Sequence, residues 1–207
     1  ELFIDPSSEE YQIASKWLKE RGIATGSNSS ALIVSLFGGQ TEDKGLPVEK
    51  MAALLKRLRD SGHTLLLTKN QRATEEVMVQ LRKAFHGNME RIYELPSTDD
   101  RPALYQYFVH LSDGGVAVDG GPMHLIHALG KPLVAIFATR WDGDRRRGRP
   151  EHWYPADADP NTERLVYIEG QFQDLADGDM DRIISEVGNV MPAKRGARLA
   201  GEDRSQS

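Results

Sequence analysis

The feature that most constrains the fold is a regular alternation of short apolar runs with amphipathic segments. Runs that read as strands occupy residues 31–37, 63–68, 91–95, 116–119, 133–138 and 164–170, and helical spacing occupies 8–20, 47–62, 73–85, 101–111, 122–129 and 178–188. Strands that are apolar along their whole length are typical of a parallel sheet covered by helices on both faces. With right-handed crossovers, the pattern predicts an α/β fold: a doubly wound, mainly parallel Rossmann-like sheet.

Composition narrows the class of protein. The net charge of −5 argues against a general nucleic-acid binder. The chain has no cysteine, which excludes disulfides and thiolate metal sites. We expect neither a membrane span nor a signal peptide. The chain begins at Glu1, so we expect a domain from a longer protein, folded over residues 1–192 with a disordered tail at 193–207.

Ligands of open α/β sheets bind at the carboxyl ends of the strands, where the segment "DGGPMH" stands at 119–124. Gly120 and Gly121 lack a Cβ atom, so the backbone can turn sharply and a ligand can approach it closely. Pro122 suits the first helical position. The free N–H groups of that helical turn form an anion site, and Asp119 can accept hydrogen bonds from sugar hydroxyls. The segment therefore predicts a bound phosphate with a polyhydroxyl group beside it.

Plainer interpretations of the same residues stay open. A strand–Gly–Gly–helix segment is often only a tight turn, and the same holds for Gly38-Gly39. Asp119 can serve as a helix cap, and His124 as an ordinary histidine of the first helical turn. His127 faces elsewhere, and we expect it to be structural. The chain has neither a G-x-G-x-x-G nor a Walker A pattern, so we expect neither a nicotinamide enzyme nor a P-loop ATPase.

Three segments in order, "FGGQTEDKGLPVEKMAAL", "DGGPMHLIHALGKP" and "VAIFAT", carry a family resemblance. Over about residues 2 to 190 the chain resembles the C-terminal, nucleotide-sugar-binding half of the heptosyltransferases, glycosyltransferase family 9. The resemblance implies the GT-B architecture, in which two Rossmann-like domains enclose the active site. It also implies that the N-terminal domain, with the acceptor site and the catalytic base, is absent from this chain.

The resemblance assigns roles to individual residues. The donor-phosphate lysine falls on Lys44, which would stabilise the leaving group, and no catalytic base is expected in this chain. The sugar-binding aspartate falls on Asp119. The remaining donor-binding positions are Gly39 and Gln40 in the loop after the first strand, Glu75 at the nucleoside ribose, Gly120 and Gly121 at the pyrophosphate, His124 in the motif, and Thr139 after the fifth strand.

The implied function is an inverting glycosyltransferase that moves a sugar, heptose from ADP-heptose in the family, to a lipopolysaccharide-like or other glycan acceptor. We expect this chain alone to be inactive. We expect no metal and no cofactor, since a lysine and a helix N-terminus can offset the leaving-group charge. We also expect a cytoplasmic protein, peripheral at the inner membrane, that binds no nucleic acid. Two alternatives stay open: a non-catalytic nucleotide-sugar-binding module and a nucleotide-sugar epimerase of the GT-B plan.

The chain departs from the family in three places. Gly120 stands where a hydroxyl residue is common, and "ATR" stands after the fifth strand where the family usually has Gly-Pro-Thr. An arginine-rich loop, "RWDGDRRRGRP", then follows. One interpretation is a solvated loop. The other assigns contacts with the donor phosphates or an anionic acceptor to Arg140, Arg145, Arg146 and Arg147, because arginine suits bidentate recognition of phosphate.

Overall fold

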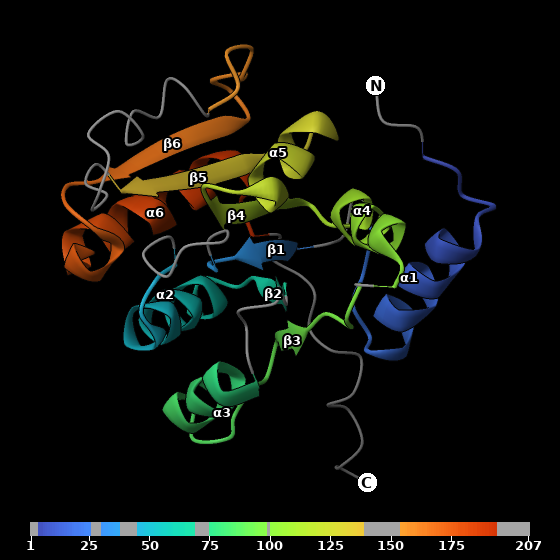
Figure 1. Cartoon of the computed structure of the whole chain (residues 1–207), viewed down its shortest axis with the longest axis horizontal. Helices are drawn as coiled ribbons and strands as arrows, with labels where there is room; N and C mark the ends of the chain where they lie inside the picture. Colours follow the sequence, from blue (N-terminus) through green and yellow to red (C-terminus); the bar gives the residue numbers. More distant parts are fainter. Residues whose placement is uncertain are drawn as a thin grey trace, which may run out of the picture.

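The computed structural model describes residues 4–25, 30–37, 45–68, 75–98, 100–138 and 154–193. Its centre is a six-stranded sheet in the order β3-β2-β1-β4-β5-β6, with every neighbouring pair parallel (Figure 1). The strands are β1 (Ala31–Ser35), β2 (Thr64–Leu67), β3 (Ile92–Glu94), β4 (Gly114–Val118), β5 (Leu133–Ala138) and β6 (Glu163–Ile168). The predicted doubly wound Rossmann-like sheet is confirmed.

Helices cover both faces of the sheet. They are α1 (Glu9–Glu20), α2 (Val48–Asp60), α3 (Glu75–Ala84), α4 (Pro102–Leu111), α5 (Gly121–Ala128) and α6 (Asp177–Val190), with a 3₁₀ helix, η4 (Phe172–Asp174), that the sequence did not predict. One core packs α2, α3 and α6 against the sheet, and a second core packs α1, α4 and α5 against it. Within β1, Leu32 belongs to the first core and Ile33 to the second, as expected where successive side chains point to opposite faces.

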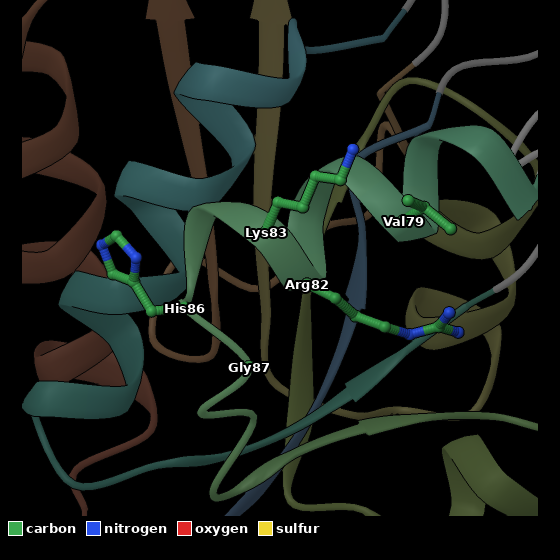
Figure 2. Close-up of a pocket in the computed structure, with 5 residues that line it drawn as sticks. All are labelled: Val79, Arg82, Lys83, His86 and Gly87. Carbon is green, nitrogen blue, oxygen red and sulfur yellow. The ribbon is translucent and has the colours of Figure 1, made fainter.

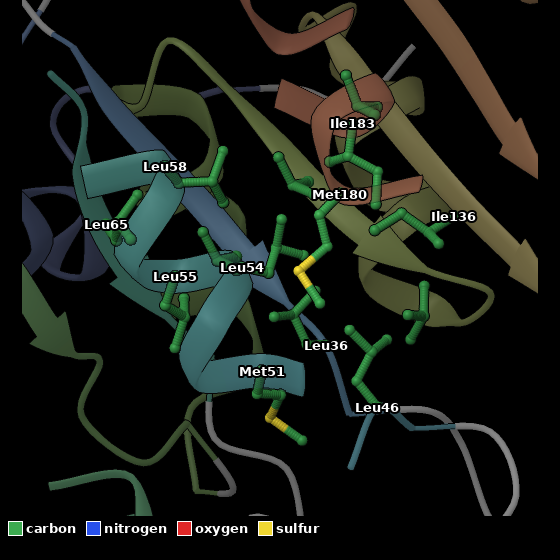
Figure 3. Packing of buried hydrophobic residues seen from close by; sticks show 14 of the residues in the cluster. Leu36, Leu46, Met51, Leu54, Leu55, Leu58, Leu65, Ile136, Met180 and Ile183 are labelled. Carbon is green, nitrogen blue, oxygen red and sulfur yellow. The ribbon is translucent and has the colours of Figure 1, made fainter. Parts of the chain in front are cut away.

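The core under α2 shows how helical spacing produces this packing. Four apolar residues of α2 recur at helical intervals and are buried: Met51, Leu54, Leu55 and Leu58. Figure 3 shows them on the side of α2 that faces the sheet, with Met180 and Ile183 of α6 completing the layer. Full burial of each such side chain contributes roughly 1.5–3 kcal/mol.

The N-terminal helix α1 begins where Ser8 caps it, since the Ser8 hydroxyl accepts a hydrogen bond from the Tyr11 N–H at 3.2 Å. The helix packs beside α4 (Figure 1), where the Trp17 ring meets the edge of Phe108 with 5.3 Å between ring centroids. This extra helix completes the second core.

Two element boundaries correct the sequence prediction. The fourth strand begins at Gly114 rather than residue 116, because Gly114 and Gly115 pair with Leu32 and Ile33 of β1. The helix after it begins at Gly121, so Pro122 is the second helical residue and not the first. Among the described residues, no helix is both long and apolar enough to cross a membrane.

Candidate functional site

The candidate site lies where the strand order reverses, at the carboxyl ends of β1 and β4. These strands are neighbours, but the chain leaves β1 toward β2 and leaves β4 toward β5. Ser35 pairs with Ala117, so Phe37 and Asp119 each lie two residues beyond a matched pair. Diverging connections leave a crevice at such a switch point, which is the usual ligand position in an open α/β sheet. The sequence placed Asp119 and its glycines at this edge, and the structure agrees.

The turn after β4 presents the N-terminus of α5 without a side-chain cap. Gly120 is the N-cap residue, so Asp119, which is half-buried, does not hold that position. The His124 N–H donates to the Gly120 carbonyl at 3.4 Å, while the His124 side chain is exposed. The earlier N–H groups of a helix have no carbonyl partner within it, and the helix dipole adds partial positive charge there. The geometry suits an anion such as a phosphate.

The two glycines of this turn are not needed by the fold. The Gly120 backbone is extended, with φ 162° and ψ 179°, which any residue can adopt. Among the described residues, a Cβ atom at Gly120 would come no closer than 3.8 Å to another heavy atom, and one at Gly121 would meet nothing within 4 Å. The sharp turn invoked from sequence is therefore wrong as the reason for these glycines. What they provide is open space beside the first turn of α5.

This open space gives a testable prediction for Gly121→Ala. We expect an unchanged melting temperature, because the new methyl group meets no atom within 4 Å in the described part of the chain. We expect nucleoside-diphosphate affinity, measured by calorimetry with ADP and UDP, to fall about tenfold, because the methyl group crowds the helix N-terminus. The matched control is Gly178→Ala, since Gly178 also has open space in the first turn of a helix, α6. Unchanged affinity in Gly121→Ala would mean that the ligand does not approach this turn.

Glu75, the first residue of α3, belongs to an ion-pair network at the β2–β3 side of the same sheet edge. Arg82 donates from Nη1 to a Glu75 oxygen at 2.8 Å and from Nη2 to a Glu94 oxygen at 2.7 Å. The two carboxylates raise the pKa of Arg82, chiefly through these hydrogen bonds. Sequence reasoning named Glu75 but not Arg82 or Glu94, because their pairing depends on α3 and β3 lying side by side.

The other predicted site residues fall outside the described ranges: Gly39, Gln40, Lys44, Thr139, Arg140, Arg145, Arg146 and Arg147. The structure does describe where the Lys44 segment returns to the sheet. The Leu46 N–H donates to the Leu36 carbonyl at 3.1 Å, so the chain is anchored at the end of β1 two residues after Lys44. This anchor lies beside the end of β4.

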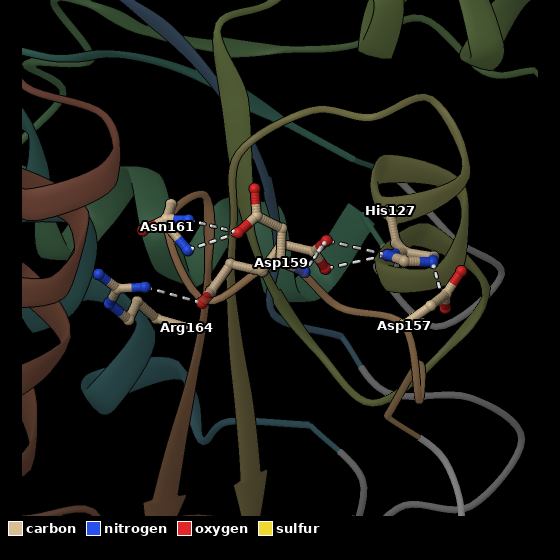
Figure 4. Close-up of polar contacts among 6 residues, drawn as sticks. His127, Asp157, Asp159, Asn161 and Arg164 are labelled. Atoms are coloured by element: carbon tan, nitrogen blue, oxygen red, sulfur yellow. Dashed lines mark hydrogen bonds and ion pairs between the residues drawn. The ribbon is translucent and has the colours of Figure 1, made fainter.

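One other polar cluster lies away from this edge. His127, near the end of α5, contacts both Glu163 oxygens at 3.1 and 3.0 Å and an Asp157 oxygen at 3.3 Å (Figure 4). Glu163 is the first residue of β6, so this cluster stands at the opposite end of the strands and ties α5 to the chain that enters β6. His127 is therefore structural in the described part of the chain, as predicted.

A shallow hollow lies along α3, lined by Val79, Arg82, Lys83, His86 and Gly87 (Figure 2). It follows the outer surface of the helix and does not open between strand ends. Within the described ranges, no three His, Cys, Asp or Glu side chains gather so that they could hold a metal ion.

The family model for glycosyltransferase family 9 (heptosyltransferase) matches residues 4–145. Curated proteins gave no match. Among solved structures, the chain is similar to the family 9 glycosyl transferase from Veillonella parvula, with TM-score 0.66 and 13% identity, covering 93% of this chain and 54% of that one.

The chain is also similar to ADP-heptose lps heptosyltransferase II of E. coli, with TM-score 0.62 and 19% identity over 91% of this chain and 53% of that one. The E. coli heptosyltransferase WaaC, solved with ADP-2-deoxy-2-fluoro heptose, gives TM-score 0.57 and 20% identity over 89% and 51%. At these identities the likeness shows the fold. The chain spans about half the length of each of these structures.

Proposed function

Since the chain belongs to glycosyltransferase family 9, we propose that it is the donor-binding half of a heptosyltransferase-type glycosyltransferase. The observation that carries the proposal is the open N-terminus of α5 beside Asp119 at the switch point of the sheet. A nucleotide sugar combines the two chemical groups that this turn suits, a pyrophosphate and a polyhydroxyl ring. Coverage of about half of each similar structure supports the half-enzyme role.

The proposed reaction is displacement at the anomeric carbon of the sugar. An acceptor hydroxyl forms the new glycosidic bond, the bond from sugar to nucleoside diphosphate breaks, and the hydroxyl proton passes to a base in the acceptor-binding half of such an enzyme. This chain stabilises the charge that develops on the leaving diphosphate. The N–H groups at Gly121 and the Lys44 ammonium supply that stabilisation, which oriented donors in a water-poor cleft provide effectively.

The remaining assignments deepen this proposal. Asp119 accepts hydrogen bonds from the sugar hydroxyls, Glu75 from the nucleoside ribose, and the arginine-rich loop after β5 contacts an anionic group of donor or acceptor. The donor is ADP-heptose and the acceptor a lipopolysaccharide-like glycan, in line with the family and with the ADP-linked ligand of one similar structure. No metal is required, because lysine and helix N–H groups carry the compensating charge. Such a protein would act at the cytoplasmic face of the inner membrane.

Calorimetry with separate ligands tests both the function and the role of Asp119. The wild-type chain should bind ADP in preference to UDP. Asp119→Asn should keep ADP affinity but lose about tenfold in affinity for ADP-heptose, because the change removes a charged acceptor from the sugar and not from the phosphates.

Asp60→Asn, at the far end of α2, removes the same charge away from this edge and serves as the control. Absence of any nucleoside-diphosphate binding by the wild type would overturn the proposed function. Equal binding of both ligands by Asp119→Asn and the wild type would overturn only the sugar contact.

A further inference from the structure

Arg82 joins two carboxylates that come from different elements of the ligand edge. Glu75 is the first residue of α3, after the connection that leaves β2, and Glu94 is the last residue of β3. Arg82 binds Glu94 through a fork, with Nε at 2.9 Å from Oε1 and Nη2 at 2.7 and 2.9 Å from the two oxygens. Its Nη1 donates to Glu75 at 2.8 Å. Figure 2 shows the Arg82 side chain extending to a different side of α3 from Lys83.

Exposure argues against a mainly stabilising role for this network. The Glu75 side chain is 68% exposed, while that of Glu94 is only 19% exposed. Exposed ion pairs contribute little to stability. A guanidinium held by a half-buried carboxylate nevertheless has a fixed orientation, and its remaining N–H group then fixes the position of a third group. Here the third group is Glu75.

The position of Glu75 indicates what such fixation serves. In dinucleotide-binding Rossmann folds, an acid that follows the second strand hydrogen-bonds the ribose 2′-hydroxyl. Glu75 follows β2 in the same chain order. A carboxylate can accept about four hydrogen bonds, so a bond from Arg82 does not by itself saturate Glu75. The Arg82 guanidinium also lies between the two carboxylates of Glu75 and Glu94 and offsets their mutual repulsion.

We propose that Arg82, anchored by Glu94, is a positioning residue that holds Glu75 for recognition of the ribose of the nucleotide donor. Arg82 does not contact the ligand itself. The inference rests on the proposed function, and the test below separates the two.

The test compares ADP with 2′-deoxy-ADP by calorimetry on the whole chain, with UDP and 2′-deoxy-UDP in their place if the wild type prefers UDP. The wild type should bind the ribonucleotide about tenfold more tightly, the scale of one hydrogen bond to a charged acceptor. Glu75→Gln should lose most of this preference. Arg82→Gln should lose it to a similar extent, and Glu94→Gln in part, with α-helical content unchanged. A merely structural role would weaken both nucleotides alike and leave their ratio intact.

Lys83→Gln is the matched control, because it removes the same charge from the next, exposed residue of α3. If Arg82→Gln fails to fold, Arg82→Lys replaces it, since lysine keeps the charge without the fork and should give an intermediate preference. Retention of the full preference in the Arg82 variant, with loss in Glu75→Gln, would overturn the positioning role. Retention in both would overturn the ribose contact as well. A wild type that binds neither nucleotide would overturn the proposed function, and this inference with it.

Discussion

Gly114→Ala is expected to lower the free energy of unfolding by about 3 kcal/mol or more, at the upper end of what overpacking costs. A Cβ atom at this position would lie 2.4 Å from the Pro132 carbonyl oxygen and 2.4 Å from the Met191 sulfur. The methionine can move, but the carbonyl cannot, because it accepts the Gly115 N–H at 2.9 Å and holds β5 to β4. Relief of the clash therefore requires the neighbouring strands β4 and β5 to separate.

Urea unfolding followed by circular dichroism measures this effect. Gly188→Ala is the matched control: a Cβ atom there meets nothing within 4 Å, and alanine favours the helical backbone of α6. We expect the control to be as stable as the wild type or slightly more stable. A Gly114→Ala protein with the wild-type unfolding midpoint would show that β4 and β5 can adjust, contrary to the geometry described above.

The same glycines show where sequence reasoning reaches its limit. The apolar runs predicted every strand, because strands buried on both faces consist mainly of apolar residues. Gly114 and Gly115 have no apolar side chain, so the sequence did not reveal that β4 begins at Gly114. Their reason lies in atoms distant in sequence: a Cβ atom on Gly115 would come within 2.6 Å of Ile126 Cδ1. Only the packed structure brings these atoms together.

The sequence also predicted only part of the candidate site: its position at a strand end, but not the contacts around it. Sequence placed Asp119 at a strand end next to an anion-binding helix start, since strand, glycines and proline follow one another along the chain. It could not show that Gly120 and Gly121 meet no obstruction, nor that Arg82 links Glu75 to Glu94. Such pairings depend on which strands are neighbours and how a helix is rotated. Sequence patterns give local periodicity but not these relations.

Lys44→Ala is expected to weaken nucleoside-diphosphate binding by about 1.5–3 kcal/mol, the usual scale for a charged hydrogen bond. The reason is the anchor at Leu46, which bonds to Leu36 at the end of β1. Because two residues span at most about 7 Å, we expect Lys44 to be within reach of that end. Neighbouring strands are about 4.8 Å apart, and the lysine stem is long enough to bring its ammonium to a diphosphate at the start of α5.

Calorimetry with ADP and UDP measures the loss. Lys56→Ala is the control, because Lys56 is an exposed lysine in the third turn of α2, away from the carboxyl ends of the strands. Loss in both nucleotides by the same factor would identify the phosphates, which they share, as the partner of Lys44. That pattern also distinguishes Lys44 from Glu75, whose removal should instead narrow the preference for ribose over deoxyribose. If the Lys44→Ala protein is folded and its affinity for both nucleotides is unchanged, the lysine does not belong to the site. Of the two groups proposed to stabilise the leaving group, only the N-terminus of α5 would then remain.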